Sequence, residues 1–122
     1  MAQLKPLTYN LRHFVKPEII DYLKRSGKVQ SSIDICEHIN SMAEELQLEK
    51  PLKPSYVRKI INEIRTLAEA PICSTSRGYY ISYKKEDIFK TTRSLEERIE
   101  SIKMASEGLR RMLNGHYTLY DF

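Results

Sequence analysis

The sequence lacks the features of membrane-bound and secreted chains. No apolar run approaches the length of a membrane-spanning helix, and the N-terminus has no signal-peptide pattern. Apolar residues make up 41% of the 122 residues and charged residues 30%, which is typical of a folded domain and not of a disordered chain. We therefore expect a cytoplasmic protein with no membrane partner.

Residue patterns for metal binding and catalysis are also missing. Two cysteines, Cys36 and Cys73, and three scattered histidines show no zinc-type spacing. In a reducing compartment the cysteines are expected to be buried thiols and not a disulfide. The sequence has no phosphate-binding glycine loop and no nucleophile elbow. We expect no metal site, no cofactor and no enzymatic activity.

Positive charge is concentrated in the middle of the chain. The net charge is +4 overall. Residues 53–93 contain nine Lys/Arg and four Asp/Glu, net +5, whereas residues 1–52 sum to zero and residues 94–122 to −1. A basic segment between neutral ones favours a polyanionic partner. An ordinary solvated surface with a mild basic bias is the alternative.

Apolar periodicity predicts three helices in the first seventy residues. A preceding arm or short helix has apolar residues on one side: Leu4, Leu7, Leu11 and Phe14. The first helix covers "KPEIIDYLKRSGK", with its stop at the Ser-Gly pair. The second begins at Ser31 or Ser32 and runs for about four turns, ending before "LEKPLKP". The third is capped by Ser55, and its apolar stripe extends to Leu67 and Ala68.

A β-hairpin is predicted in "APICSTSRGYYIS", which covers residues 70–82. Residues 72–74 and 79–83 are the expected strands, with Gly78 in the turn and Arg77 at the tip. Alternation puts Tyr79, Ile81 and Tyr83 on one face, which packs against the helices. Tyr80 is expected to be exposed or to stack on a sugar.

A long helix is predicted from Glu86 or Asp87 to the Asn114-Gly115 stop signal. Its seam repeats at steps of three and four: Ile88, Thr92, Leu95, Ile99, Ile102, Ser106, Leu109 and Leu113. Such a seam needs a partner helix or must fold back on the domain. We favour a homodimer, because two-fold dimers are common and suit DNA half-sites. The expected dimer contacts are Leu95, Ile99, Ile102, Leu109 and Leu113.

Three helices followed by a hairpin with a basic tip form the order of a winged helix-turn-helix domain. The stretch "SYVRKIINEIRTLAEAPICSTSRGYYIS" resembles the DNA-binding domain of the biotin repressor. The "RSLEER" stretch at residues 93–98 is similar to the helix after the wing in small phage and prophage winged-helix proteins. The resemblance covers about residues 16–100 and implies a mainly α fold with a small β-hairpin. It implies a winged helix-turn-helix domain with an N-terminal arm at 1–84, and a C-terminal helix with an aromatic tail at 85–122. The connection before the third helix departs from the usual turn of three or four residues.

The resemblance implies double-stranded DNA as the partner, with the third helix in the major groove and the hairpin on the backbone. Arginine suits guanine edges and asparagine suits adenine edges, whereas Arg77 would contact phosphate. We expect a sequence-preferring regulator of transcription or replication in a phage or mobile element. The candidate DNA contacts are Ser55, Tyr56, Arg58, Lys59, Asn62, Arg65, Arg77, Lys84 and Lys85.

Two alternatives stay open. The third helix can simply show its solvated side. The domain can also be a protein interaction module, an adapter or an inhibitor of a host or replication protein, because winged helices serve in both ways. That module would use the same surface or the aromatic residues 117–122. The low charge of the third helix favours it, since three basic residues oppose Glu63 and Glu69 for a net charge of only +1.

Overall fold

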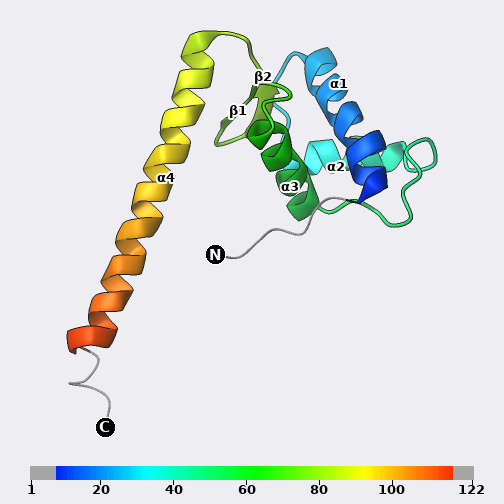
Figure 1. Cartoon of the computed structure of the whole chain (residues 1–122). Helices are drawn as coiled ribbons and strands as arrows, with labels where there is room; N and C mark the ends of the chain where they lie inside the picture. The colour runs from blue at the N-terminus through cyan, green and yellow to red at the C-terminus, as the bar shows by residue number, and fades with distance from the viewer. Residues whose placement is uncertain (1–7, 117–122) are drawn as a thin grey trace. The chain divides into compact units, whose positions relative to one another are not determined.

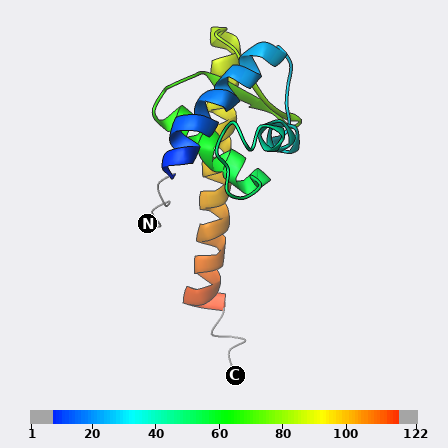
Figure 2. The same cartoon turned by 90° about the vertical axis from the view of Figure 1, so that its right-hand side faces the viewer.

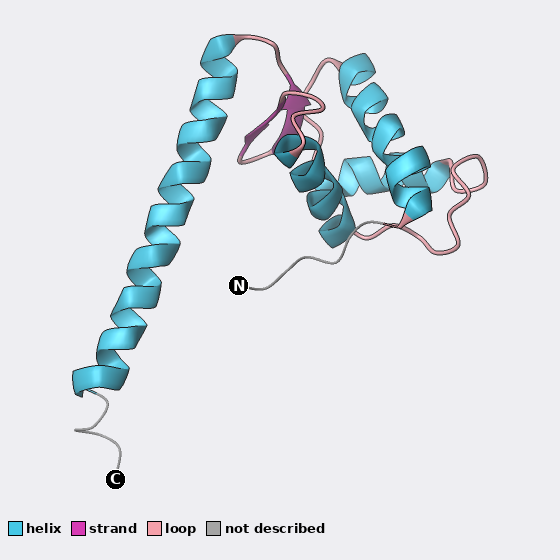
Figure 3. Ribbon diagram, in the orientation of Figure 1, coloured by secondary structure: helices cyan, strands magenta, loops and turns pink. Residues whose placement is uncertain are grey.

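The computed structural model describes residues 8–116, which are mainly helical with one small hairpin (Figures 1 and 3). The chain divides into two compact units, the first ending at Ile88 and the second beginning at Phe89. No helix in the described residues is long and apolar enough to cross a membrane. The expected aromatic tail, and Leu4 and Leu7 of the expected arm, lie outside the described residues.

The first element of the described chain is a short π-helical turn, η1 (Leu11–Val15), that continues directly into α1 (Lys16–Ser26). Leu11 and Phe14 pack against the core, so this part of the expected arm is a short helix. Gly27 ends α1 in the left-handed region at φ 62°, where glycine has no steric cost. The first predicted helix and its stop are confirmed.

The second helix, α2 (Ser32–Ser41), is shorter than predicted. Ser31 is its cap: the Ser31 hydroxyl accepts from the Asp34 amide and the Asp34 carboxylate accepts from the Ser31 amide, each at 3.0 Å. After Ser41 the chain continues in turns to Gln47, which has φ 56°. The prediction of a helix of about four turns is wrong. Leu46 is buried in the non-helical segment after α2, so the apolar pattern of the sequence extends beyond the end of the helix.

The third helix, α3 (Pro54–Thr66), begins with proline and not with a serine cap. Lys53 is the N-cap residue and no side chain caps the helix, so the expected role of Ser55 is wrong. Proline holds the preceding residue extended and suits the first helical position, which sets the boundary here. Leu67 and Ala68 are exposed because α3 has already ended, and Ala68 has φ 53°. The buried stripe is Val57, Ile60, Ile61 and Ile64.

The hairpin consists of β1 (Ile72–Thr75) and β2 (Gly78–Ile81), paired antiparallel around a two-residue turn. Tyr79 and Ile81 pack against the core as predicted. Tyr83 does not, because β2 ends at Ile81 and the alternation ends with it; Tyr83 is 69% exposed. The predicted hairpin is confirmed, but its boundaries differ. Gly78 is the first residue of β2 and not part of the turn, β1 ends one residue later than predicted, and β2 ends two residues earlier.

The core of the first unit lies between α1, α2, α3 and the hairpin. Helix α1 packs against α2, α3 and β2, and α3 packs against α2 and β1; Figure 2 gives a second view of this arrangement. Cys36 and Cys73 are both buried free thiols, as expected. The connection from α2 to α3 is held by Asn40, whose side-chain amide exchanges two hydrogen bonds with the Leu52 backbone, at 2.7 and 3.1 Å.

The last helix, α4 (Lys85–Arg111), begins one or two residues before the predicted start and provides nearly all of the described second unit. It continues into a π-helical turn, η2 (Met112–His116). Asn114 and Gly115, the predicted stop, lie in this turn, and the residues that follow His116 are outside the described part of the chain.

Candidate nucleic-acid interface

The outward face of α3 carries most of the predicted DNA contacts. Ser55, Tyr56, Arg58 and Asn62 are exposed, and Lys59 is half-buried. The Lys59 ammonium lies 5.5 Å from the centre of the Tyr56 ring, within range of a cation–π contact. This face therefore offers arginine and asparagine side chains to a ligand, with a lysine held close to the helix surface.

Arg65 is directed to the hairpin. Its guanidinium donates from Nε to the carbonyl oxygen of Ile72 at 2.8 Å and from Nη2 to the hydroxyl of Ser74 at 3.1 Å. The same group lies 5.6 Å from the Tyr79 ring centre. Arg65 thus joins α3 to both strands of the hairpin, and it is half-buried.

The hairpin is also attached to the connection between α1 and α2. Gln30 forms an isolated antiparallel bridge with Tyr79, and the two backbones exchange hydrogen bonds of 2.8 Å. The buried Gln30 side chain accepts from the Tyr22 hydroxyl at 2.7 Å. Sequence reasoning missed this contact, because a single bridge has no periodicity to detect. The hairpin is thus held from two sides.

The tip of the hairpin is exposed. Arg77 lies in the two-residue turn with Ser76, and its amide donates to the Thr75 hydroxyl at 3.1 Å. Lys84 and Lys85, after β2, are exposed as well. In the part of the chain that the structure describes, Arg77, Lys84 and Lys85 have no ion-pair partner at 4 Å or less. Their charges are available to an external anion.

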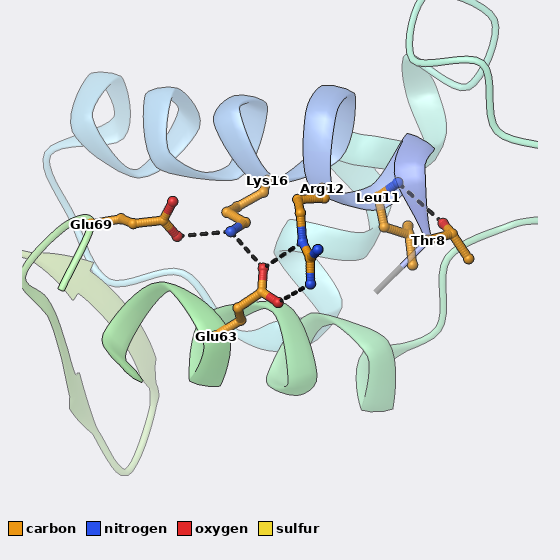
Figure 4. A network of polar contacts seen from close by, with 6 residues as sticks. All are labelled: Thr8, Leu11, Arg12, Lys16, Glu63 and Glu69. Atoms are coloured by element: carbon orange, nitrogen blue, oxygen red, sulfur yellow. Dashed lines mark hydrogen bonds and ion pairs between the residues drawn. The ribbon is translucent and has the colours of Figure 1, made fainter. Parts of the chain in front are cut away.

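The acidic residues beside this face are paired with the N-terminal segment (Figure 4). Glu63 accepts from Arg12 at 2.7 Å and from the Lys16 ammonium at 2.5 Å. Lys16 also reaches Glu69, at 2.8 Å. Hydrogen bonds from Arg12 and then Lys16 hold the pKa of Glu63 below its usual value. Burial alone would lower the pKa of Lys16, but its two carboxylate partners raise it.

This network changes the charge of the α3 surface. Lys16 is 4% exposed, and its position between two carboxylates explains how a lysine is buried here. Both acidic residues that reduced the predicted charge of the third helix are thus neutralised by Arg12 and Lys16. No local sequence signal could have identified this pairing, because the partners lie about fifty residues apart. The outward face of α3 is left with Arg58 and Lys59 as its charged groups.

The expected dimer residues lie along α4. Ile99, Ile102, Leu109 and Leu113 are 65%, 69%, 70% and 64% exposed, and Leu95 is half-buried. Leu113 lies in η2, beyond the α-helical part of the seam. Among the described residues, no group of three or more His, Cys, Asp or Glu side chains is placed to hold a metal ion.

Comparisons with models of protein families, with curated proteins and with solved structures found no match to this chain.

Proposed function

We propose that this protein is a winged helix-turn-helix protein that binds double-stranded DNA and has no enzymatic activity. Helix α3 lies in the major groove and the β1–β2 hairpin is the wing, in contact with the backbone. The observation that carries the proposal is the pairing of Glu63 and Glu69 with Arg12 and Lys16. It leaves a cationic surface on α3 where the sequence alone shows almost no net charge.

The side chains on that surface match the chemistry of base readout. Arg58 suits the O6 and N7 acceptors of guanine, and Asn62, one turn later, suits the N6 and N7 groups of adenine. Arg65 has a positioning role, because its hydrogen bonds to Ile72 and Ser74 support a fixed placement of the wing beside α3. A fixed wing lets two elements contact one duplex without an ordering cost.

The wing and the segment after it suit the phosphate backbone. Arg77, Lys84 and Lys85 are exposed cations, and contacts of this kind orient a protein on DNA without reading its sequence. The connection between α2 and α3, residues 42–53, is longer than the usual turn of three or four residues. The role as a regulator of transcription or replication in a phage or mobile element is supported by the resemblance of residues 93–98 to small phage proteins.

The test is a selection from randomised duplexes followed by fluorescence anisotropy at several salt concentrations. Arg58→Ala is expected to weaken the selected sequence by about tenfold or more and random duplexes much less. Arg77→Ala is expected to weaken all duplexes alike and to reduce the salt slope by about one. Lys24→Ala, which removes an exposed lysine from α1, is the charge-matched control and should change little.

If neither Arg58→Ala nor Arg77→Ala differs from Lys24→Ala at low salt, the DNA-binding proposal is wrong. A stoichiometric protein partner captured by the same chain, with only nonspecific DNA affinity, would instead support the interaction-module alternative.

A further inference from the structure

The seam of α4 is an exposed apolar face. Ile99, Ile102 and Leu109 are each at least 65% exposed. The only ion pair within the described part of α4, Arg93 with Glu97 at 3.7 Å, lies away from these residues by helical position. Exposed apolar groups at this spacing are typical of a helix that pairs with another helix.

We propose that the occupant is α4 of a second copy, and that the two helices run antiparallel. With the helices aligned so that Ile99 of each copy faces Ile102 of the other, every polar seam position meets a leucine. Thr92 faces Leu109 of the second copy, and Ser106 faces Leu95. In a parallel pair the same positions would form Thr92–Thr92 and Ser106–Ser106 layers, which bury hydroxyls against each other.

The charges that flank the seam favour the same arrangement. In heptad terms, Glu96, Lys103 and Arg110 occupy e positions and Arg98 occupies a g position. An antiparallel pair places e positions beside each other, so Glu96 of each copy lies next to Lys103 of the other. A parallel pair places g beside e, which would bring Arg98 next to Lys103 twice. The antiparallel pair therefore has two attractions where the parallel pair has two repulsions.

The flanking charges and the length of the seam together select one alignment. Sliding the two antiparallel helices by one heptad in one direction brings Glu96 against its own copy, which is destabilising. Sliding them in the other direction brings Lys103 against its own copy, although Glu96 then lies beside Arg110. Either slide also leaves two of the eight seam residues without a partner. The alignment centred between Ile99 and Ile102 avoids both like-charge contacts and pairs all eight seam residues.

The experiment measures self-association of the full chain by analytical ultracentrifugation. The unmodified chain is expected to be a dimer. Lys103→Glu is expected to weaken the dimer by about tenfold, because it places a new carboxylate beside Glu96 at two places in the pair. In a parallel dimer the same change would tighten association, because the new carboxylate would lie beside Arg98. The direction of this one shift therefore separates the two orientations.

Charge exchange provides the matched control. Glu96→Lys is also expected to weaken the antiparallel dimer, and the double variant Glu96→Lys with Lys103→Glu is expected to restore it. Mixing the two single variants should give a heterodimer of native strength. All substituted side chains are exposed, so circular dichroism should show an unchanged helical content. A double variant as weak as the single ones would overturn the proposal.

Spin labels give a measurement that does not depend on affinity. Cys36 and Cys73 are buried, so a label can be directed to Lys90→Cys on the side of α4 away from the seam. In the proposed pair, position 90 lies opposite position 111 of the second copy, which separates the two labels by about 32 Å along the axis at 1.5 Å per residue. Labels side by side, or a monomer at every accessible concentration, would overturn the proposal.

Discussion

Gln30 and Tyr79 exchange two backbone hydrogen bonds of 2.8 Å, which attach the outer edge of the hairpin to the connection between α1 and α2. This bridge brings the chain at Gln30 against Gly78, the first residue of β2. The position of the proposed wing therefore depends on how closely two backbones can approach at one glycine.

Gly78→Ala is expected to lower the free energy of unfolding by at least about 2 kcal/mol, through steric overlap and an unfavourable φ. A Cβ atom at this position would lie 2.3 Å from the carbonyl oxygen of Gln30, and Gly78 has φ +145°. Urea denaturation measures the change. Gly108→Ala is the matched control: it lies inside α4, and a Cβ there would be in ordinary van der Waals contact with the Arg111 guanidinium at 3.7 Å, so the same substitution should stabilise by about 1 kcal/mol. Equal effects at the two sites would contradict the close approach.

Asn40→Ala is expected to lower the free energy of unfolding by about 1–3 kcal/mol. The side chain of Asn40 bonds both the amide and the carbonyl of Leu52, and alanine leaves these backbone groups without that partner. Asn62→Ala, on the exposed face of α3, is the control and should leave stability unchanged or slightly raised, since alanine is the better helix former. If Asn40→Ala is as stable as Asn62→Ala, the connection does not depend on this bond pair.

The sequence was sufficient for features that rest on local patterns. The end of α1 at Gly27, the buried stripe of α3 up to Ile64 and the hairpin after Pro71 follow from glycine and proline chemistry and from periodicity. The sequence pattern was misleading at two places. Leu46 is buried although α2 has already ended, so its apolar side chain made the predicted helix too long. Pro54 and Ser55 are adjacent helix-start signals, and the pattern pointed to the wrong one.

The contacts that shape the candidate site lie beyond such patterns. Lys16 with Glu63 and Gln30 with Tyr79 join residues about fifty apart, so only the tertiary structure brings them together. Arg65 was predicted as one of several outward residues of α3. Its bonds to Ile72 and Ser74 depend on where the hairpin returns, which periodicity does not specify.

Acid is expected to destabilise the fold through Glu63. Its pKa is lowered in the folded protein, first by the hydrogen bond from Arg12 and then by that from Lys16, against an unfolded value of 4.5. A lowered pKa contributes stability that is fully present above the unfolded value and is lost as the pH falls through the folded value. Unfolding free energies measured by urea between about pH 6 and pH 2 should therefore fall with acid.

Glu63→Gln isolates this contribution. The variant is expected to be less stable than the native chain at neutral pH and to lose less stability on acidification, so that the two curves converge at low pH. Glu45→Gln, an exposed residue of the turns after α2, should leave the curve of the native chain unchanged. Parallel curves for Glu63→Gln and the native chain would show that the pair with Arg12 and Lys16 does not stabilise the fold.

Arg65→Lys should separate positioning from base contact. Lysine keeps the charge, but its single ammonium cannot reproduce the planar fork that bonds Ile72 and Ser74 together. The free energy of unfolding is expected to fall by about 1–3 kcal/mol. Affinity for selected and random duplexes should fall by a similar factor, because the wing is displaced while the groups of α3 that read bases are intact.

Arg58→Lys, on the exposed face of the same helix, is the matched control: it should retain stability and lose mainly the preference for the selected sequence. If Arg65→Lys leaves unfolding unchanged and relaxes sequence preference as Arg58→Lys does, then Arg65 reads bases, and the placement of the wing depends on the Gln30 bridge.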